Sequence, residues 1–287
     1  MSNFNVLNRY LFTDAHARGE LVQLTSSYQS IINNHNYPEG VQKLLGELLA
    51  ATCLLTATLK FEGDITVQLQ GDGPVGYMSV SGDNNQQMRG IAKLTEATNA
   101  TTLNELIGKG TMVITIRPKQ GEAYQGVVAL EKDNLAGCLA HYFDVSEQID
   151  TNVWLFSDTK QVAGALVQLL PDGDGSIENK AKQQTDFDHL SQLTNTIKQD
   201  EIFNLEAEAL LYRLYHQEKV NIFEPQRVSY QCGCSQEKCL SAISQIEPSE
   251  IKSILAEQGK ISMTCDYCVT TYDFDELSLK SFISKVN

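Results

Sequence analysis

The sequence Cys232-Gly233-Cys234, followed later by Cys265-Asp266-Tyr267-Cys268, decides how the C-terminal end of this chain folds. Two close pairs of thiolates are a typical ligand set for structural zinc, because tetrahedral Zn²⁺ takes four sulfur ligands at about 2.3 Å. A small fold between the pairs can bring them together without long unstructured loops. The spacing therefore predicts one zinc ion per chain, bound by Cys232, Cys234, Cys265 and Cys268.

The chain has seven cysteines, and the other three have different surroundings. Cys53 and Cys138 lie in apolar stretches with a helical pattern, where a free cysteine is usually a small buried hydrophobe. Cys239 follows Cys234 on a predicted helix and could lie near the site, but four ligands are already available. We expect no metal-binding role for Cys53 and Cys138, and we leave Cys239 out of the ligand set with its role open.

The composition argues against nucleic acid and membranes as partners. The chain carries 36 acidic and 22 basic residues, which gives a net charge of -14. Phosphate binding depends on clustered Lys and Arg, so no nucleic-acid partner is expected. The sequence also lacks an uninterrupted run of about eighteen apolar residues, so we expect no membrane span.

The N-terminal sequence shows no basic segment followed by an apolar one, so no secretory signal is predicted and we expect a cytoplasmic protein. Thiols stay reduced in the cytosol, where cysteine clusters usually indicate metal or redox function rather than structural disulfides. At 287 residues, the chain can form one sizeable core and a small additional unit.

Hydrophobic periodicity predicts an α+β fold whose N-terminal domain, residues 1–175, has a mostly antiparallel sheet packed by helices. A long helix starts near Pro38 and runs to about residue 59. Alternation of apolar and polar residues predicts a hairpin of strands 65–69 and 77–81 around Gly71-Asp72-Gly73-Pro74. Further strands are expected at 88–94, 112–117, 124–130, 152–157 and 163–170, with helices near 102–107 and 133–148.

A helical linker region, residues 176–231, and a small zinc-binding module, residues 232–287, complete the predicted architecture. The polar stretch 171–184 is expected to be linker. Helices are expected at 189–198 and 204–217, and because both carry many charges they need a partner surface for stability. In the last module we expect a helix at 248–258, ended by Gly259, and a C-terminal helix from about Glu276.

Several motifs together resemble the heat shock protein 33 family, the 33 kDa chaperonins, over essentially the whole chain. The resemblance rests on Arg9-Tyr10-Leu11-Phe12, Arg18-Gly19-Glu20-Leu21-Val22, the runs 54–61, 63–74, 84–90 and 124–128, and above all the two cysteine pairs. One position departs from the family pattern. Members commonly have Gly after the last cysteine, where this chain has Val269, and a positive φ there would strain a β-branched residue.

The resemblance implies a redox-regulated holdase chaperone that is not an enzyme. Such a protein is zinc-bound and inactive when reduced, and it binds unfolding client proteins under oxidative stress. The implied disulfides are Cys232–Cys234 and Cys265–Cys268, which must expel zinc because a thiolate cannot serve both bonds. The resemblance also implies a homodimer after oxidation. No Gly-x-x-x-x-Gly-Lys-Ser/Thr motif is present, in agreement with activity independent of ATP.

Two alternative functions remain open from the sequence. A thiol-disulfide oxidoreductase would use Cys265 and Cys268, although such enzymes usually place this motif at a helix N-terminus, and here a β-like hairpin is expected. A zinc-ribbon adaptor would bind a partner constitutively. The physiological oxidant, the clients and the dimer geometry are not determined by the sequence.

Overall fold

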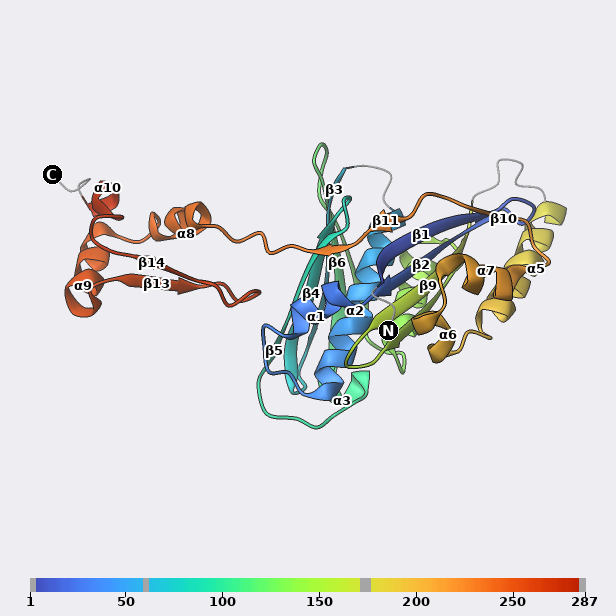
Figure 1. The fold of residues 1–287 in the computed structure, drawn as a ribbon, viewed down its shortest axis with the longest axis horizontal. Helices are drawn as coiled ribbons and strands as arrows, with labels where there is room; N and C mark the ends of the chain where they lie inside the picture. The colour runs from blue at the N-terminus through green and yellow to red at the C-terminus, as the bar shows by residue number, and fades with distance from the viewer. Residues whose placement is uncertain (1–3, 59–61, 171–176, 284–287) are drawn as a thin grey trace. The chain divides into compact units, whose positions relative to one another are not determined.

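The computed structural model describes residues 4–58, 62–170 and 177–283. The chain divides into two compact units, Met1–Gln231 and Cys232–Asn287 (Figure 1). The helical segment after residue 176 thus belongs to the first unit. The three-part division into 1–175, 176–231 and 232–287 stays a prediction.

The first unit contains two six-stranded sheets, where a single sheet was expected. In the first sheet the strand order is β10-β1-β2-β9-β8, with β11 also paired to β1, and all pairs are antiparallel. Its strands are β1 (Asn5–Phe12), β2 (Ala17–Leu24), β8 (Thr151–Ser157), β9 (Val162–Leu169), β10 (Val220–Ile222) and β11 (Gln226–Arg227).

The second sheet contains the predicted hairpin. Its order is β12-β5-β4-β3-β6-β7, and every pair is antiparallel except β12 with β5. Its strands are β3 (Gly63–Gly71), β4 (Val75–Asp83), β5 (Gln87–Leu94), β6 (Gly110–Pro118), β7 (Tyr124–Ala129) and β12 (Ser229–Tyr230). The prediction of a mostly antiparallel α+β fold is confirmed.

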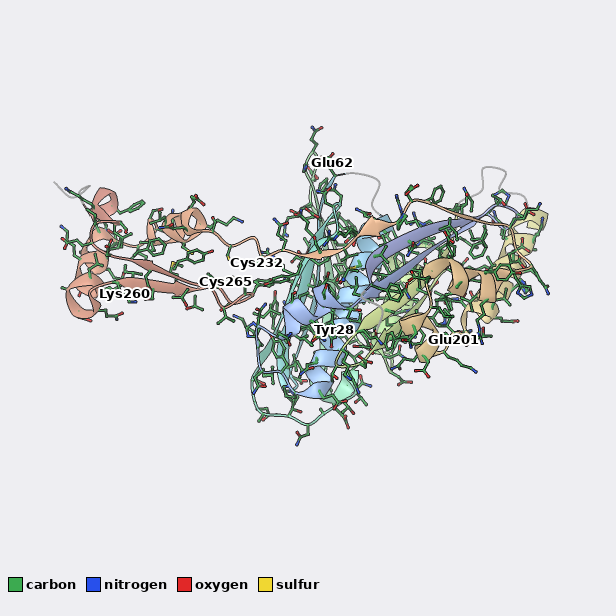
Figure 2. The ribbon with its side chains drawn as sticks, viewed as in Figure 1. Tyr28, Glu62, Glu201, Cys232, Lys260 and Cys265 are labelled. Atoms are coloured by element: carbon green, nitrogen blue, oxygen red, sulfur yellow. The ribbon has the colours of Figure 1, made fainter. Side chains whose placement is uncertain are left out.

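Helix α2 (Glu39–Thr58) forms the centre of the core and contacts strands of both sheets, as its broad apolar face predicted. It is the one helix among the described residues that is long and apolar enough to cross a membrane, but 78% of that stretch is buried inside the protein, and a core helix passes the same test. Tyr28 of α1 (Ser26–Ile32) is fully buried, and its hydroxyl lies 2.9 Å from the carbonyls of both Gln42 and Asp158 (Figure 2).

Two further helices of the first unit were predicted from the sequence. The expected helix 102–107 is present as α3 (Leu103–Ile107). The expected helix 133–148 is shorter than predicted, because α4 (Leu135–Tyr142) passes into a π-helical turn, η1 (Phe143–Glu147).

Strands β1 and β2 and helix α1 were not predicted, although β2 lies inside the first sheet. Nearly every residue of β2 is buried, so its sequence lacks the polar and apolar alternation that marks a half-exposed strand.

Three helices cover one face of the first sheet: α5 (Ile177–Thr194), α6 (Gln199–Asn204) and α7 (Ala207–Tyr215). The prediction that 171–184 is linker is wrong for 177–184, which start α5, while 171–176 lie outside the described residues. This segment is rich in Glu, Lys, Gln and Ala, which favour helix without an apolar period. The rings of Phe12 and Tyr215 meet edge to face with centroids 4.8 Å apart, so α7 packs directly on β1.

The second unit is small. It comprises α8 (Gln236–Ile243), α9 (Pro248–Gln258), the hairpin β13 (Ile261–Thr264) with β14 (Thr271–Phe274), and α10 (Lys280–Ile283). The predicted helix 248–258 is confirmed as α9, and Gly259 follows it as the C-cap residue with φ 73. The C-terminal helix starts at Lys280 rather than near Glu276.

Candidate metal centre

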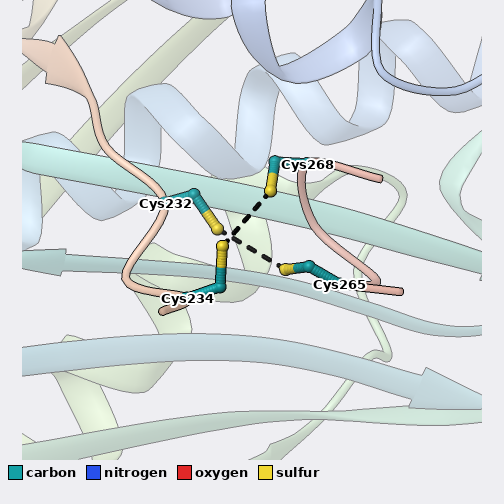
Figure 3. Close-up of side chains that lie close together, drawn as sticks. All are labelled: Cys232, Cys234, Cys265 and Cys268. Atoms are coloured by element: carbon teal, nitrogen blue, oxygen red, sulfur yellow. Dashed lines mark hydrogen bonds between the residues drawn. The ribbon is translucent and has the colours of Figure 1, made fainter. Parts of the chain in front are cut away.

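Two loops present the four predicted ligands. Cys232 and Cys234 lie in the extended segment before α8, and Cys265 and Cys268 lie on the turn between β13 and β14. All four sulfur atoms lie within 4.8 Å of one another (Figure 3). The Sγ–Sγ distance is 3.6 Å for Cys232 and Cys265 and 3.4 Å for Cys234 and Cys268. The fold thus brings the two sequence motifs together.

The sulfur geometry fits a tetrahedral metal ion. A regular tetrahedron with metal–sulfur bonds of about 2.3 Å has sulfur atoms about 3.8 Å apart. The observed separations are close to this value, and all four side chains are half-buried. These four cysteines could therefore bind a metal ion with little rearrangement.

The turn between Cys265 and Cys268 is held by backbone hydrogen bonds. The amide of Val269 donates to the carbonyl of Cys265 at 2.9 Å, and the amide of Cys265 donates to the carbonyl of Thr270 at 2.9 Å. Val269 has φ 57, so the positive φ expected at this departure from the family pattern is present.

Polar neighbours that the sequence did not single out surround the sulfur atoms. The Cys268 thiol lies 3.2 Å from the Thr270 hydroxyl, and Cys234 Sγ lies 3.3 Å from the Tyr272 hydroxyl. Burial acts to raise the pKa of Cys268, but hydrogen bonds with Thr270, Cys234 and Cys232 together outweigh it and lower that pKa to about 6. Burial, together with neighbouring thiols, raises the pKa of Cys232. Thr270 and Tyr272 follow the last cysteine closely, and that proximity was their only sequence signal.

The remaining cysteines lie outside this group. Cys53 and Cys138 are fully buried, and burial raises the pKa of both thiols. Cys239 on α8 is half-buried against the apolar cluster of the second unit. Cys265 and Cys268 flank a hairpin turn at which no helix begins in the described chain, so they lack the helix N-terminus usual in oxidoreductases.

The fold has a counterpart among solved structures of chaperones. A crystal structure of the 33 kDa chaperonin from Thermotoga maritima matches with a TM-score of 0.84, covering 98% of this chain and 99% of that chain. Only 20% of the residues are identical, so this similarity concerns the fold alone.

Sequence comparisons identify the family. Residues 5–275 match the Hsp33 protein family. A 33 kDa chaperonin from Colwellia psychrerythraea is 82% identical over 289 residues, covering 100% of both chains. Another from Shewanella sediminis is 55% identical over 280 residues, covering 97% of this chain and 95% of the relative. The chain therefore belongs to the Hsp33 family of chaperones, and the resemblance inferred from its motifs is confirmed.

Proposed function

We propose that this chain is a redox-regulated, ATP-independent holdase that acts in the cytoplasm under oxidative stress. In the reduced state one Zn²⁺ would be bound by Cys232, Cys234, Cys265 and Cys268, and the protein would be inactive. Oxidation would release the ion, expose apolar surface to unfolded client proteins and lead to a homodimer. The chaperone family of the chain and the four-thiol geometry support this proposal.

The observation that carries the proposal is the small core of the second unit. Its described residues include five buried hydrophobic residues, which are Ile243, Ile251, Ile261, Phe274 and Leu279. A core of this size contributes about 3–5 kcal/mol of stability, whereas structural zinc contributes about 10–16 kcal/mol of apparent binding free energy. We therefore infer that the unit unfolds once its thiolates no longer bind the ion.

The chemistry requires a two-electron oxidant. Each pair of thiolates gives up two electrons, forms one disulfide and ceases to be a metal ligand. We propose that the disulfides are Cys232–Cys234 and Cys265–Cys268, as the family resemblance implies. Sulfur contacts of 3.6 and 3.4 Å also join the two motifs, so pairing needs a direct measurement.

Mass spectrometry of the oxidised protein measures that pairing. Cleavage after Lys252, between the motifs, should yield two separate peptides that each contain an internal disulfide. Peptides that remain linked until reduction would show pairing between the motifs and contradict the proposal.

The segment just before Cys232 can pass a change in the second unit to the first. β11 pairs with β1 and β12 with β5, and the amide of Gln231 donates to the carbonyl of Met88 at 2.9 Å. Val228, between these strands, is 1% exposed. We propose that unfolding beyond Gln231 weakens this pairing and then the packing of α5, α6 and α7. Loss of that cover would expose the apolar face of the first sheet, a surface suited to unfolded chains.

Zinc content and suppression of aggregation, measured on the same sample before and after oxidation, test the function. We expect oxidation to release one Zn²⁺ per chain and to raise suppression without nucleotide. The Cys265→Ser protein should bind zinc weakly, whereas the matched Cys239→Ser protein should behave as wild type. Equal suppression by the reduced and oxidised forms would favour a constitutive adaptor. Catalytic reduction of model disulfides without client binding would favour an oxidoreductase.

A further inference from the structure

A cavity of about 410 Å³ lies between the two sheets of the first unit. Its apolar walls include Leu55 of α2, Ile65 of β3, Ile116 of β6 and Phe143 of the π-helical turn. Small-molecule sites typically have volumes of about 300–1,000 Å³ and mostly apolar walls, and π-helical turns are frequent at functional sites. The size and lining therefore suit a small, mostly apolar ligand.

One arginine, Arg18, borders this cavity and has no hydrogen-bonded carboxylate partner among the described residues. Arg18 donates from Nε and Nη2 to the side-chain oxygen of Gln168, at 3.0 and 2.6 Å, and this acceptor is neutral. Its ion pair with Glu20 is long, because Glu20 Oε1 lies 3.8 Å from Arg18 Nε, beyond hydrogen-bond distance. No hydrogen bond from the described residues engages Arg18 Nη1. The guanidinium can thus still donate to an anion.

Glu20 supplies a second observation. Its side chain is 2% exposed, and its Oε2 has no hydrogen-bond partner among the described residues. It lines a neighbouring cavity of about 390 Å³, which shares Arg18 and Leu170 with the first and also includes Arg9. Burial raises the pKa of Glu20 to about 7, although Arg18 and Arg9 act to lower it. A bound polar group at this place would give the buried Oε2 atom a hydrogen-bond partner.

We propose that these adjoining cavities bind a small amphiphilic carboxylate. Its apolar tail would lie against Ile65 and Ile116, which are paired neighbours on β3 and β6, and its head group would accept hydrogen bonds from Arg18. Glu147 also lines the larger cavity, but its Oε1 already accepts a hydrogen bond from the Tyr142 hydroxyl at 2.7 Å. The free donor of Arg18 therefore favours an anionic head group over a cationic or neutral one. This site uses none of the four clustered cysteines and does not depend on the proposed redox function.

Titration of the reduced, full-length protein with octanoate, followed by calorimetry and isoleucine methyl NMR, tests the site. Octanoate should bind and shift the methyl signals of Ile65 and Ile116, while 1-octanol and octylamine should bind much more weakly. Arg18→Met should weaken octanoate binding by about tenfold or more, because a hydrogen bond to a charged group is lost. Arg117→Met is the matched control. Arg117 is an exposed residue of β6, so this variant should leave octanoate binding unchanged.

A second variant, which fills the cavity, keeps the test decisive if Arg18→Met does not fold. Ile116→Phe should block octanoate while unfolding near the wild-type temperature. Equal binding of octanoate by wild type, Arg18→Met and Ile116→Phe would overturn the proposal, as would tighter binding of octylamine or 1-octanol. Undetectable octanoate binding by folded wild type would also overturn it.

Discussion

At the scale of single residues, Val269 carries backbone strain beside the metal centre. Its φ of 57 is unfavourable for a β-branched side chain, and the residue is 47% exposed, so little packing compensates the strain. Val269→Gly should therefore stabilise the second unit by about 1 kcal/mol, after allowing for the greater entropy of glycine in the unfolded chain. Thermal unfolding of the zinc-loaded protein, followed by hydrogen exchange in β13 and β14, measures this gain.

Val269→Ala is the matched control, because alanine removes the branch but keeps the unfavourable φ. Val269→Ala should therefore stabilise the second unit less than Val269→Gly does. If Val269→Gly lowers the stability of the second unit, contacts of the valine side chain outweigh its strain.

Glu20 should make the first unit less stable as pH rises. Burial raises the pKa of Glu20 from 4.5 to about 7, so the folded state holds this proton more tightly than the unfolded state. The resulting stability is fully present below pH 4.5 and is lost as pH rises through 7. Glu20→Gln should remove this loss. At pH 8 the free energy of unfolding of the variant should exceed that of wild type by on the order of 3 kcal/mol.

Urea unfolding at pH 5 and pH 8, followed by fluorescence of the single tryptophan, Trp154, reports this effect in the first unit. Burial raises the pKa of Glu47 to about 7 as well, so the variant should keep part of the pH dependence. Identical pH dependence in wild type and Glu20→Gln would show that Glu20 titrates near its ordinary pKa.

At the scale of secondary-structure elements, Gln23 fixes the C-terminal end of α6, just before α7, to the first sheet. Its Nε2 donates to the carbonyls of Ile202 at 2.6 Å and Leu205 at 2.9 Å. Gln23→Leu should leave these carbonyls unpaired and loosen α6 and α7 by about 1–3 kcal/mol. Hydrogen exchange in both helices should accelerate relative to α2. If the proposed function holds, the reduced variant should also bind clients more than reduced wild type does.

Gln29→Leu is the control for this element. Gln29 also donates from Nε2 to two carbonyls, those of Thr159 and Lys160, both at 2.9 Å, but neither belongs to the covering helices. The Gln29→Leu variant should leave hydrogen exchange in α6 and α7 unchanged. Equal acceleration by both variants would indicate general destabilisation rather than a local clamp.

At the scale of the whole molecule, removal of the metal should affect the two units differently. The first unit has its own large core around α2, whereas the second relies on a small cluster and the four thiols. After chelation or oxidation, limited proteolysis should cut mainly beyond residue 171 and leave a resistant N-terminal fragment. Mass spectrometry of the fragments identifies the cut sites. Equal cutting throughout the first 170 residues would contradict independent stability of the first unit.

Local sequence predicted secondary structure correctly wherever one residue type, or one periodic pattern of apolar residues, dominates a segment. The strong apolar face of α2, the turn after β3 and Gly259 at the end of α9 were all predicted, as were the cysteines that cluster. Residues 177–184 were misassigned because helix propensity without an apolar period resembles a polar linker. Thr270 and Tyr272 were missed because nothing but their position near Cys268 distinguished them.

The sequence by itself determined the α+β class, the family and the four cysteines that come together, because periodicity and ligand spacing act over short stretches of chain. Only the tertiary structure decided that there are two sheets, that β2 is buried between β1 and β9, and that Arg18 and Glu20 border cavities. Strand pairing and cavity lining join residues far apart in the chain, such as Arg18 and Gln168. Such contacts depend on how the elements pack and leave no local pattern in the sequence.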